Sequence, residues 1–119
     1  IGDSALAEEV LLDAVAAGKP SAQAAYPLGV ARYRQGAHLA AISAFDESIA
    51  ADLNAFDSRI NRGLCHMALE QYDEAIEDFT ACLEMDARSD IARYYRGLCH
   101  RALGRLDLAE ADLMAAVGD

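Results

Sequence analysis

The chain has 119 residues, 54% of them hydrophobic and only two of them proline, and alanine and leucine are its dominant residues. This length predicts one domain that buries a core without disulfides or metal, and the composition predicts an all-α fold. Twenty acidic against ten basic side chains give a formal charge of −10, which would repel nucleic acid and an anionic membrane surface alike.

The first predicted helix spans residues 4–17, where apolar residues recur every three or four positions. Gly18 ends this helix. A second helix should run to about Gln35, but it contains Pro27, which cannot donate a backbone hydrogen bond. We expect a late start near Ala25, with Pro27 in the first turn; the alternative is a kink at Pro27.

Five further helices are expected, which makes about seven in all. Asn54 and Ser89 are plausible N-caps for two of them. Their predicted ranges are 39–52, 56–69, 72–85, 90–103 and 106–117.

An internal repeat organises the second half of the chain. The sequence Arg-Gly-Leu-Cys-His at residues 62–66 returns 34 residues later at 96–100. When residues 56–85 are aligned with 90–119, twelve of the thirty pairs are identical. Periodicity of this kind fixes the architecture. The recurring columns hold a glycine, an alanine and a large apolar residue: Gly29, Gly63, Gly97; Ala41, Ala75, Ala109; Phe45, Phe79, Leu113.

This pattern resembles the tetratricopeptide repeat, most clearly from Gly63 to Phe79. The resemblance implies helix-turn-helix pairs stacked in a right-handed superhelix, with residues 1–119 as a single domain. It also implies three repeats, and it makes the leading helix, 4–17, half of a fourth. The three repeats are 22–55, 56–89 and an incomplete 90–119.

In this family the first helix of each repeat lines a concave groove, so the resemblance implies a groove here that binds a protein or peptide partner. Apolar and aromatic residues outnumber charges there, which suits an apolar or basic peptide held by a few buried anchors. Leu64 and Leu98 have an alternative role in core packing. The positions implied by the resemblance are Tyr26, Val30, Tyr33, Ile60, Asn61, Leu64, Ile91, Tyr94 and Leu98.

Other tetratricopeptide grooves hold acidic chaperone tails in a basic clamp, and of the positions that match this clamp only Asn61 fits. Residues 26–36 also resemble the first repeat of tetratricopeptide chaperones of bacterial type III secretion, so a chaperone for an apolar client is an alternative function. A self-assembling structural fragment is another, because Leu106, Leu113 and Val117 would leave an apolar end uncovered and favour a homodimer.

One column departs from the family pattern. Leu28 of the first repeat is replaced by arginine in the other two, and Ala44, sixteen residues later, is replaced by aspartate. We expect two structural ion pairs between the helices of a repeat; the alternative is that all four side chains reach solvent. The pairs are Arg62 with Asp78 and Arg96 with Asp112. Glu70 is a second departure, because it stands where the other repeats have glycine and is expected in a left-handed turn.

The repeated Cys-His pairs could suggest a metal site or a thiol–imidazole dyad. Adjacent residues on a helix point about 100° apart, and equivalent helices lie roughly 10 Å apart, too far for metal bonds near ~2 Å. We therefore expect packed thiols, no metal, no cofactor and no enzyme, since phosphate loops and acid–base clusters are also missing from the sequence.

The three cysteines are an odd number and lie in helical patterns, which favours a reducing compartment over a disulfide framework. No run of about 18 apolar residues occurs, and the start is acidic where a signal peptide would be basic. We expect a cytoplasmic protein without membrane insertion. The missing initiator methionine suggests a trimmed chain or a piece of a longer one.

Overall fold

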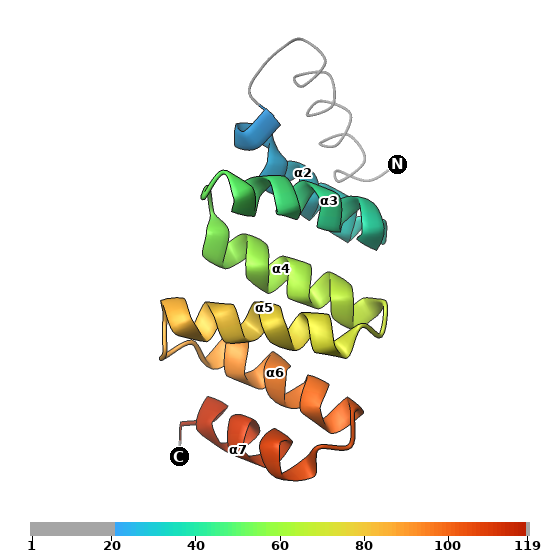
Figure 1. The fold of residues 1–119 in the computed structure, drawn as a ribbon. Coiled ribbons are helices and arrows are strands. Elements are labelled where there is room, and N and C mark those ends of the chain that lie inside the picture. The colour runs from blue at the N-terminus through green and yellow to red at the C-terminus, as the bar shows by residue number, and fades with distance from the viewer. Residues whose placement is uncertain (1–20, 119) are drawn as a thin grey trace. The chain divides into compact units, whose positions relative to one another are not determined.

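The computed structural model describes residues 21–118, and these contain six α-helices and no β-strand. This confirms the all-α repeat fold; the predicted helix 4–17 lies outside the described residues. None of the described helices combines the length and apolar character that crossing a membrane requires. The helices, labelled in Figure 1, are α2 (Ser21–Arg34), α3 (His38–Ala50), α4 (Ala55–Ala68), α5 (Tyr72–Met85), α6 (Asp90–Ala102) and α7 (Leu106–Ala116).

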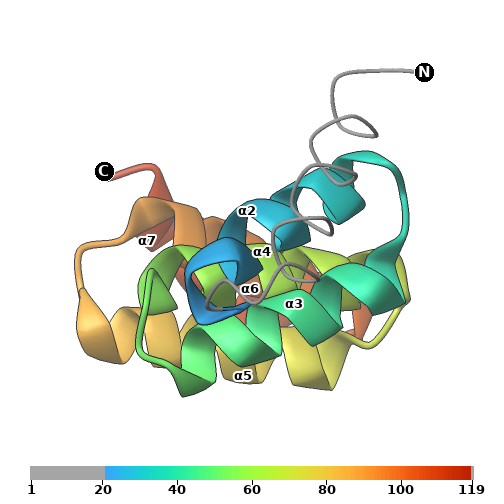
Figure 2. The same cartoon turned by 90° about the horizontal axis from the view of Figure 1, so that it is seen from above.

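The chain divides into two compact units, residues 1–61 and 62–119. In the first unit α2 packs on α3, and the turn between them reverses the chain direction (Figure 2). Gly29 makes this approach possible, because a Cβ placed there would lie 2.5 Å from the Phe45 ring. Phe45 and Ala41 are fully buried. The large ring thus fills the space that the glycine leaves.

The expected late start of α2 is wrong. The helix begins at Ser21 and contains Pro27 in its interior. Pro27 is exposed, and so is Gln23 four residues before it, whose carbonyl loses the hydrogen bond. Water can satisfy a carbonyl on an exposed helix face, so the proline does not end the helix here.

In the second unit α6 packs on both α5 and α7, and the connecting turns lie at alternating ends (Figure 1). The glycine column repeats the contact of the first unit. A Cβ on Gly63 would lie 2.7 Å from the Phe79 ring, and one on Gly97 would lie 2.9 Å from Leu113 Cγ. Cys65, Cys82 and Cys99 are fully buried, as small residues in closely packed helices.

The turns confirm two local predictions. Ser89 caps α6, because its hydroxyl accepts a hydrogen bond from the Ala92 amide at 3.2 Å. Glu70 has a φ of 60° in the turn between α4 and α5, where the equivalent Gly36 and Gly104 have φ values of 79° and 78°. Asn54 precedes α4 and also has a positive φ, of 54°.

Candidate functional site

The candidate surface of the first unit lies on α2 and on the start of α4. Tyr26, Val30 and Tyr33 follow one side of α2 and are half-buried, as is Asn61 of α4. Ile60 is different: it is 6% exposed and packs in the core. It lies about 100° around the helix from Asn61, on the inward side, so it does not belong to a binding surface.

Asn61 is already engaged within the first unit. Its side-chain nitrogen donates to the Tyr26 hydroxyl at 3.3 Å and to the Asp57 carbonyl at 3.0 Å. Burial, with a smaller contribution from the charge of Asp57, raises the pKa of Tyr26, which keeps the phenol neutral. Both amide hydrogens of Asn61 therefore have acceptors. The one residue that matched the basic clamp has no donor left for a carboxylate in this arrangement.

In the second unit the candidate side chains lie on α6 and on the end of α4. Ile91 and Tyr94 are 48% and 46% exposed, and Leu64 and Leu98 are half-buried. The Tyr94 ring meets the Tyr95 ring edge-on, with centroids 5.3 Å apart. Two large side chains are therefore displayed to solvent on α6, next to leucines that are partly covered.

Tyr95 connects this surface to the core. Its ring stacks on Phe79 of α5, with centroids 5.8 Å apart and planes 23° from parallel. Aromatic pairs of this geometry stabilise by roughly 0.5–1.5 kcal/mol beyond the area that they bury. Sequence reasoning missed this role of Tyr95, although an adjacent pair of tyrosines on a helix was a signal for it.

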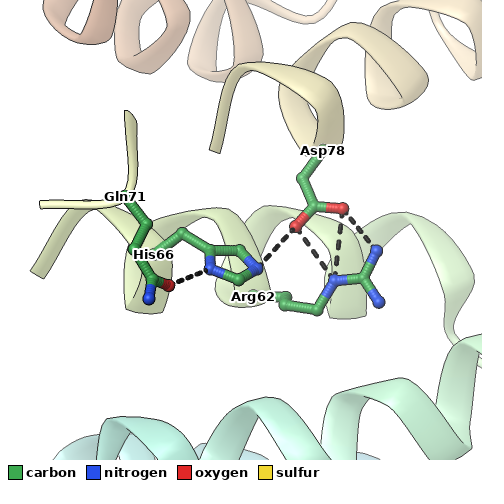
Figure 3. A network of polar contacts seen from close by, with 4 residues as sticks. All are labelled: Arg62, His66, Gln71 and Asp78. Atoms are coloured by element: carbon green, nitrogen blue, oxygen red, sulfur yellow. Dashed lines mark hydrogen bonds and ion pairs between the residues drawn. The ribbon is translucent and has the colours of Figure 1, made fainter. Parts of the chain in front are cut away.

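The structure brings the predicted ion-pair residues together. The Nη2 of Arg62 donates to one oxygen of Asp78 at 2.6 Å, and Nε donates to the other at 2.9 Å. His66 points at the same carboxylate from the other side, with its Nε2 3.9 Å away, while its Nδ1 lies 2.8 Å from Gln71 Oε1 (Figure 3). Bidentate geometry of this kind is among the stronger charge-assisted arrangements.

The third repeat forms the same pair with different neighbours. Arg96 donates to the two oxygens of Asp112 from Nε at 2.7 Å and Nη2 at 2.8 Å, which raises the pKa of Arg96. Its Nη1 donates to Thr80 of α5 at 3.3 Å. His100 lies 3.9 Å from Asp112, but its buried Nδ1 has no hydrogen-bond partner among the described residues. Arg105 replaces Gln71 there, so the second imidazole contact is lost.

Burial makes two of the three cysteines unreactive in this fold. Burial raises the pKa of Cys65 to about 12 and that of Cys99 to about 11. At neutral pH both are thiols, which are neither good nucleophiles nor metal ligands. Within residues 21–118 no group of three His, Cys, Asp or Glu side chains could hold a metal ion.

Charge is sorted between the two helix types, a feature that the sequence reasoning missed. All arginines within the six described helices lie on the first helices α2, α4 and α6. The second helices α3, α5 and α7 carry acidic residues and no lysine or arginine. The net charge of the chain is therefore not the charge of the candidate surface, and counting charges per helix would have revealed this from the sequence.

Comparison with known proteins identifies the repeat. A model of the tetratricopeptide repeat matches residues 1–58 and again 60–118. No curated protein matches the chain in sequence. Among solved structures, a MamA protein aligns with a TM-score of 0.88 at 29% identity, over 98% of this chain and 63% of that one. MamA from Desulfovibrio magneticus RS-1 aligns with a TM-score of 0.76 over 98% and 75% of the two chains, but at 20% identity it shows the fold alone.

A second kind of relative carries a ligand. The second tetratricopeptide domain of Spaghetti (RPAP3), bound to the HSP90 peptide SRMEEVD, aligns at 26% identity with a TM-score of 0.76. That alignment covers 82% of this chain and 90% of the relative. By contrast, the chain spans 56% of one MamA chain and 63% of another.

Proposed function

Because this chain belongs to the tetratricopeptide-repeat family, we propose that it binds an apolar peptide segment of a partner protein through first helices, namely α6 and the end of α4 in the second unit. The family match and the peptide-bound relative support a protein–protein interaction module. The proposed ligand is extended or helical, with one or two large apolar side chains as anchors. Its contacts are the candidate side chains of the second unit: Leu64, Ile91, Tyr94 and Leu98.

The exposure of Ile91 and Tyr94 is the observation that carries this proposal. Nearly half of each large side chain faces solvent on α6. Tyr94 is backed by Tyr95, and Tyr95 by Phe79, so the exposed ring rests on a supported surface. A rigid aromatic side chain offers contact area at a low entropy cost, which is why tyrosine is frequent among residues that dominate binding energy.

The charge distribution favours an apolar over a basic ligand. The −10 charge of the whole chain would attract a basic peptide. The acidic side chains, however, are concentrated on α3, α5 and α7, whereas α6 carries Arg93, Arg101 and Asp90 in addition to Arg96, whose charge is paired with Asp112. A basic peptide would meet like charge on α6, so the apolar ligand is the better supported of the two.

The RPAP3 relative binds the acidic peptide SRMEEVD, and Asn61, the one residue here that matches the basic clamp, does not favour such a ligand. A clamp that holds such a peptide needs free hydrogen-bond donors for its carboxylates. The two amide hydrogens of Asn61 are already donated to the Tyr26 hydroxyl and to the Asp57 carbonyl. Tyr26 is itself an acceptor in this contact. The peptide SRMEEVD is therefore a suitable negative comparison for this chain.

Selection from a random peptide library displayed on phage tests the proposal. We expect the immobilised chain to enrich peptides with aromatic or branched aliphatic residues and without a charge bias. Selection on the Ile91→Ser/Tyr94→Ser variant should not enrich them. Binding of SRMEEVD as tight as that of the selected peptides would contradict the proposal, and so would enrichment of the same peptides on the variant.

A further inference from the structure

The second unit contains two histidines at equivalent positions with different surroundings. His66 and His100 end the two copies of the sequence Arg-Gly-Leu-Cys-His, 34 residues apart. The Nε2 atom of each lies 3.9 Å from an aspartate that an arginine already engages, Asp78 for His66 and Asp112 for His100. Both imidazoles therefore face a carboxylate in the same way, and they differ at the other ring nitrogen, Nδ1.

The Nδ1 atom of His66 has a hydrogen-bond partner. It lies 2.8 Å from the side-chain oxygen of Gln71 (Figure 3). An amide oxygen only accepts, so Nδ1 carries the proton of the neutral ring. When the ring becomes charged, the second proton is added to Nε2, which faces Asp78. A charged His66 thus has an acceptor on each side, and no contact of the neutral ring is lost.

The Nδ1 atom of His100 is buried and has no hydrogen-bond partner among the described residues. The proton of neutral His100 therefore belongs on Nε2, which faces Asp112. A second proton would be added to Nδ1. A buried N–H group without an acceptor is costly, so the folded repeat disfavours the charged ring.

The charges around His100 do not offset this cost. They are Asp112 of α7, Arg105 of the turn, Arg96 of α6 and Asp73 of α5. Burial, the largest effect, lowers the pKa of His100, and the two arginines act in the same direction against the two aspartates. Arg96 holds Asp112 through two hydrogen bonds, and Arg105 is 3.2 Å from Asp73. Each carboxylate near the ring is thus already paired with an arginine.

The difference between the two histidines comes from one turn residue. Gln71 in the second repeat corresponds to Arg105 in the third. Their backbones match, with φ and ψ of −94° and 70° at Gln71 and −87° and 73° at Arg105. The amide of each donates to the carbonyl of its histidine at 2.8 Å. A glutamine at position 105 would therefore reach His100 as Gln71 reaches His66.

We propose that acid loosens the contact between α6 and α7 through His100 and spares the contact between α4 and α5, and that residues 105 and 71 set this difference. Separation of α6 from α7 brings His100 into water, where it takes up a proton at its ordinary pKa of about 6.5. The closed pair binds this proton less well, so its stability is fully present above that pH and decreases below it. The device consists of helix contacts and does not depend on the proposed function.

Nitrogen NMR of the imidazoles tests the protonation of the two neutral rings. At about pH 7.5 we expect a proton on Nδ1 of His66 and on Nε2 of His100. Gln71→Met removes the acceptor and should shift His66 toward the form with its proton on Nε2. The same form at both positions in the original chain would overturn the proposal.

Amide hydrogen exchange, corrected for the intrinsic effect of pH, tests the opening. Between about pH 7.5 and about pH 5.5, the interior amides of α7 should lose protection by about three- to tenfold. Those of α5 should lose less than about twofold, because His66 keeps an acceptor on each side. Equal losses in the two helices would contradict the proposal. His38 lies in the first unit, so this comparison within the second unit does not include it.

Two substitutions at position 105 separate the missing acceptor from the charge of the arginine. Arg105→Gln supplies the acceptor and should reduce the acid-induced loss in α7 to less than about twofold. Arg105→Met is the matched control, because it removes the charge and the ion pair with Asp73 without supplying a carbonyl oxygen; a loss of at least about threefold should remain. Position 105 is exposed, so both variants leave the core intact. Equal losses in the two variants would overturn the role of the turn residue.

Discussion

Arg62 and Asp78 form a bidentate ion pair between α4 and α5, with Nη2 and Nε of the arginine 2.6 Å and 2.9 Å from the two carboxylate oxygens. The first repeat has Leu28 and Ala44 at the equivalent positions. An ion pair in the second repeat therefore stands where the first repeat has two apolar residues. The third repeat has the same ion pair, between Arg96 and Asp112.

Removal of one partner of this pair should destabilise the protein more than removal of both. The Asp78 side chain is 5% exposed and that of Arg62 is 24% exposed, so a lone charge would remain partly desolvated. We expect Asp78→Ala to lower the free energy of unfolding by about 2–4 kcal/mol and the double variant with Arg62→Leu to recover much of it. Urea unfolding of the original chain, the two single variants and the double variant gives the coupling free energy between Arg62 and Asp78.

The control pair is Arg105 with Asp73, whose contact is 3.2 Å but whose side chains are 45% and 67% exposed. Its coupling should lie in the range of surface pairs, roughly 0.2–1 kcal/mol. A coupling between Arg62 and Asp78 no larger than this control would mean that solvent screens both pairs alike.

Glu70→Gly should stabilise the protein by roughly 1 kcal/mol. Glu70 has a φ of 60°, a left-handed conformation that costs a residue with a Cβ about 1–2 kcal/mol. The matched test is Gly104→Ala at the equivalent turn, where φ is 78° and no atom lies within 4 Å of an added Cβ. Gly104→Ala should lower the free energy of unfolding by a similar amount, because the positive φ is the only obstacle to alanine at this position. Opposite signs in thermal or urea unfolding support the explanation, whereas a destabilising Glu70→Gly refutes it.

Gly63→Ala should destabilise the protein although alanine favours helix. The added Cβ would lie 2.7 Å from the Phe79 ring, and overpacking of this kind costs about 1–3 kcal/mol against a helix-propensity gain of about 1 kcal/mol. In a Phe79→Val background, where the side chain is shorter, the same substitution should cost less. Equal costs in the two backgrounds, measured by urea unfolding, would show that the ring does not set the requirement for glycine.

His100 should make stability depend on pH. Burial lowers the pKa of His100, with Arg105 and Arg96 acting in the same direction and Asp112 and Asp73 opposing. As the pH falls below the ordinary histidine pKa of about 6.5, the unfolded chain takes up the proton first. The free energy of unfolding should therefore decrease as the pH falls through about 6.5, and the contribution is fully present above it.

Urea unfolding at about pH 7.5 and about pH 6 measures this decrease while the carboxylates stay ionised. His100→Gln removes the titrating group and should show a smaller decrease between the two pH values. If the variant and the original chain lose the same stability, the burial of His100 has no part in the pH dependence.

Much of the fold follows from one sequence feature, the 34-residue period. It aligns Gly63 with Gly97 and Phe79 with Leu113, and the contact between these columns is what holds each helix pair together. Local rules were sufficient for Ser89 and Glu70, whose cap and left-handed turn are confirmed. They failed at Pro27, because the penalty for a proline within a helix depends on whether the freed carbonyl meets water or protein.

The candidate surface was less accessible to sequence reasoning. Family columns assign side chains to a helix face, but burial also depends on neighbouring helices, and so Ile60 was included although it packs in the core. The columns also could not show that Asn61 bonds to Tyr26 across a separation of 35 residues. To predict a hydrogen bond of this kind, the positions of both side chains must be known, and an alignment of repeats within one sequence does not give them.

The most direct test of the central claim compares two exposed residues on helices of different type. Tyr94 on α6 is 46% exposed and Met85 on α5 is 50% exposed, so both offer similar area to a ligand. We predict that Tyr94→Ala weakens the binding of a library-selected apolar peptide by about 1–3 kcal/mol, roughly 5- to 150-fold in Kd by fluorescence anisotropy, and that Met85→Ala changes it less than about twofold. Equal affinities of the two variants, or a larger loss in Met85→Ala, would contradict the assignment of peptide binding to the first helices.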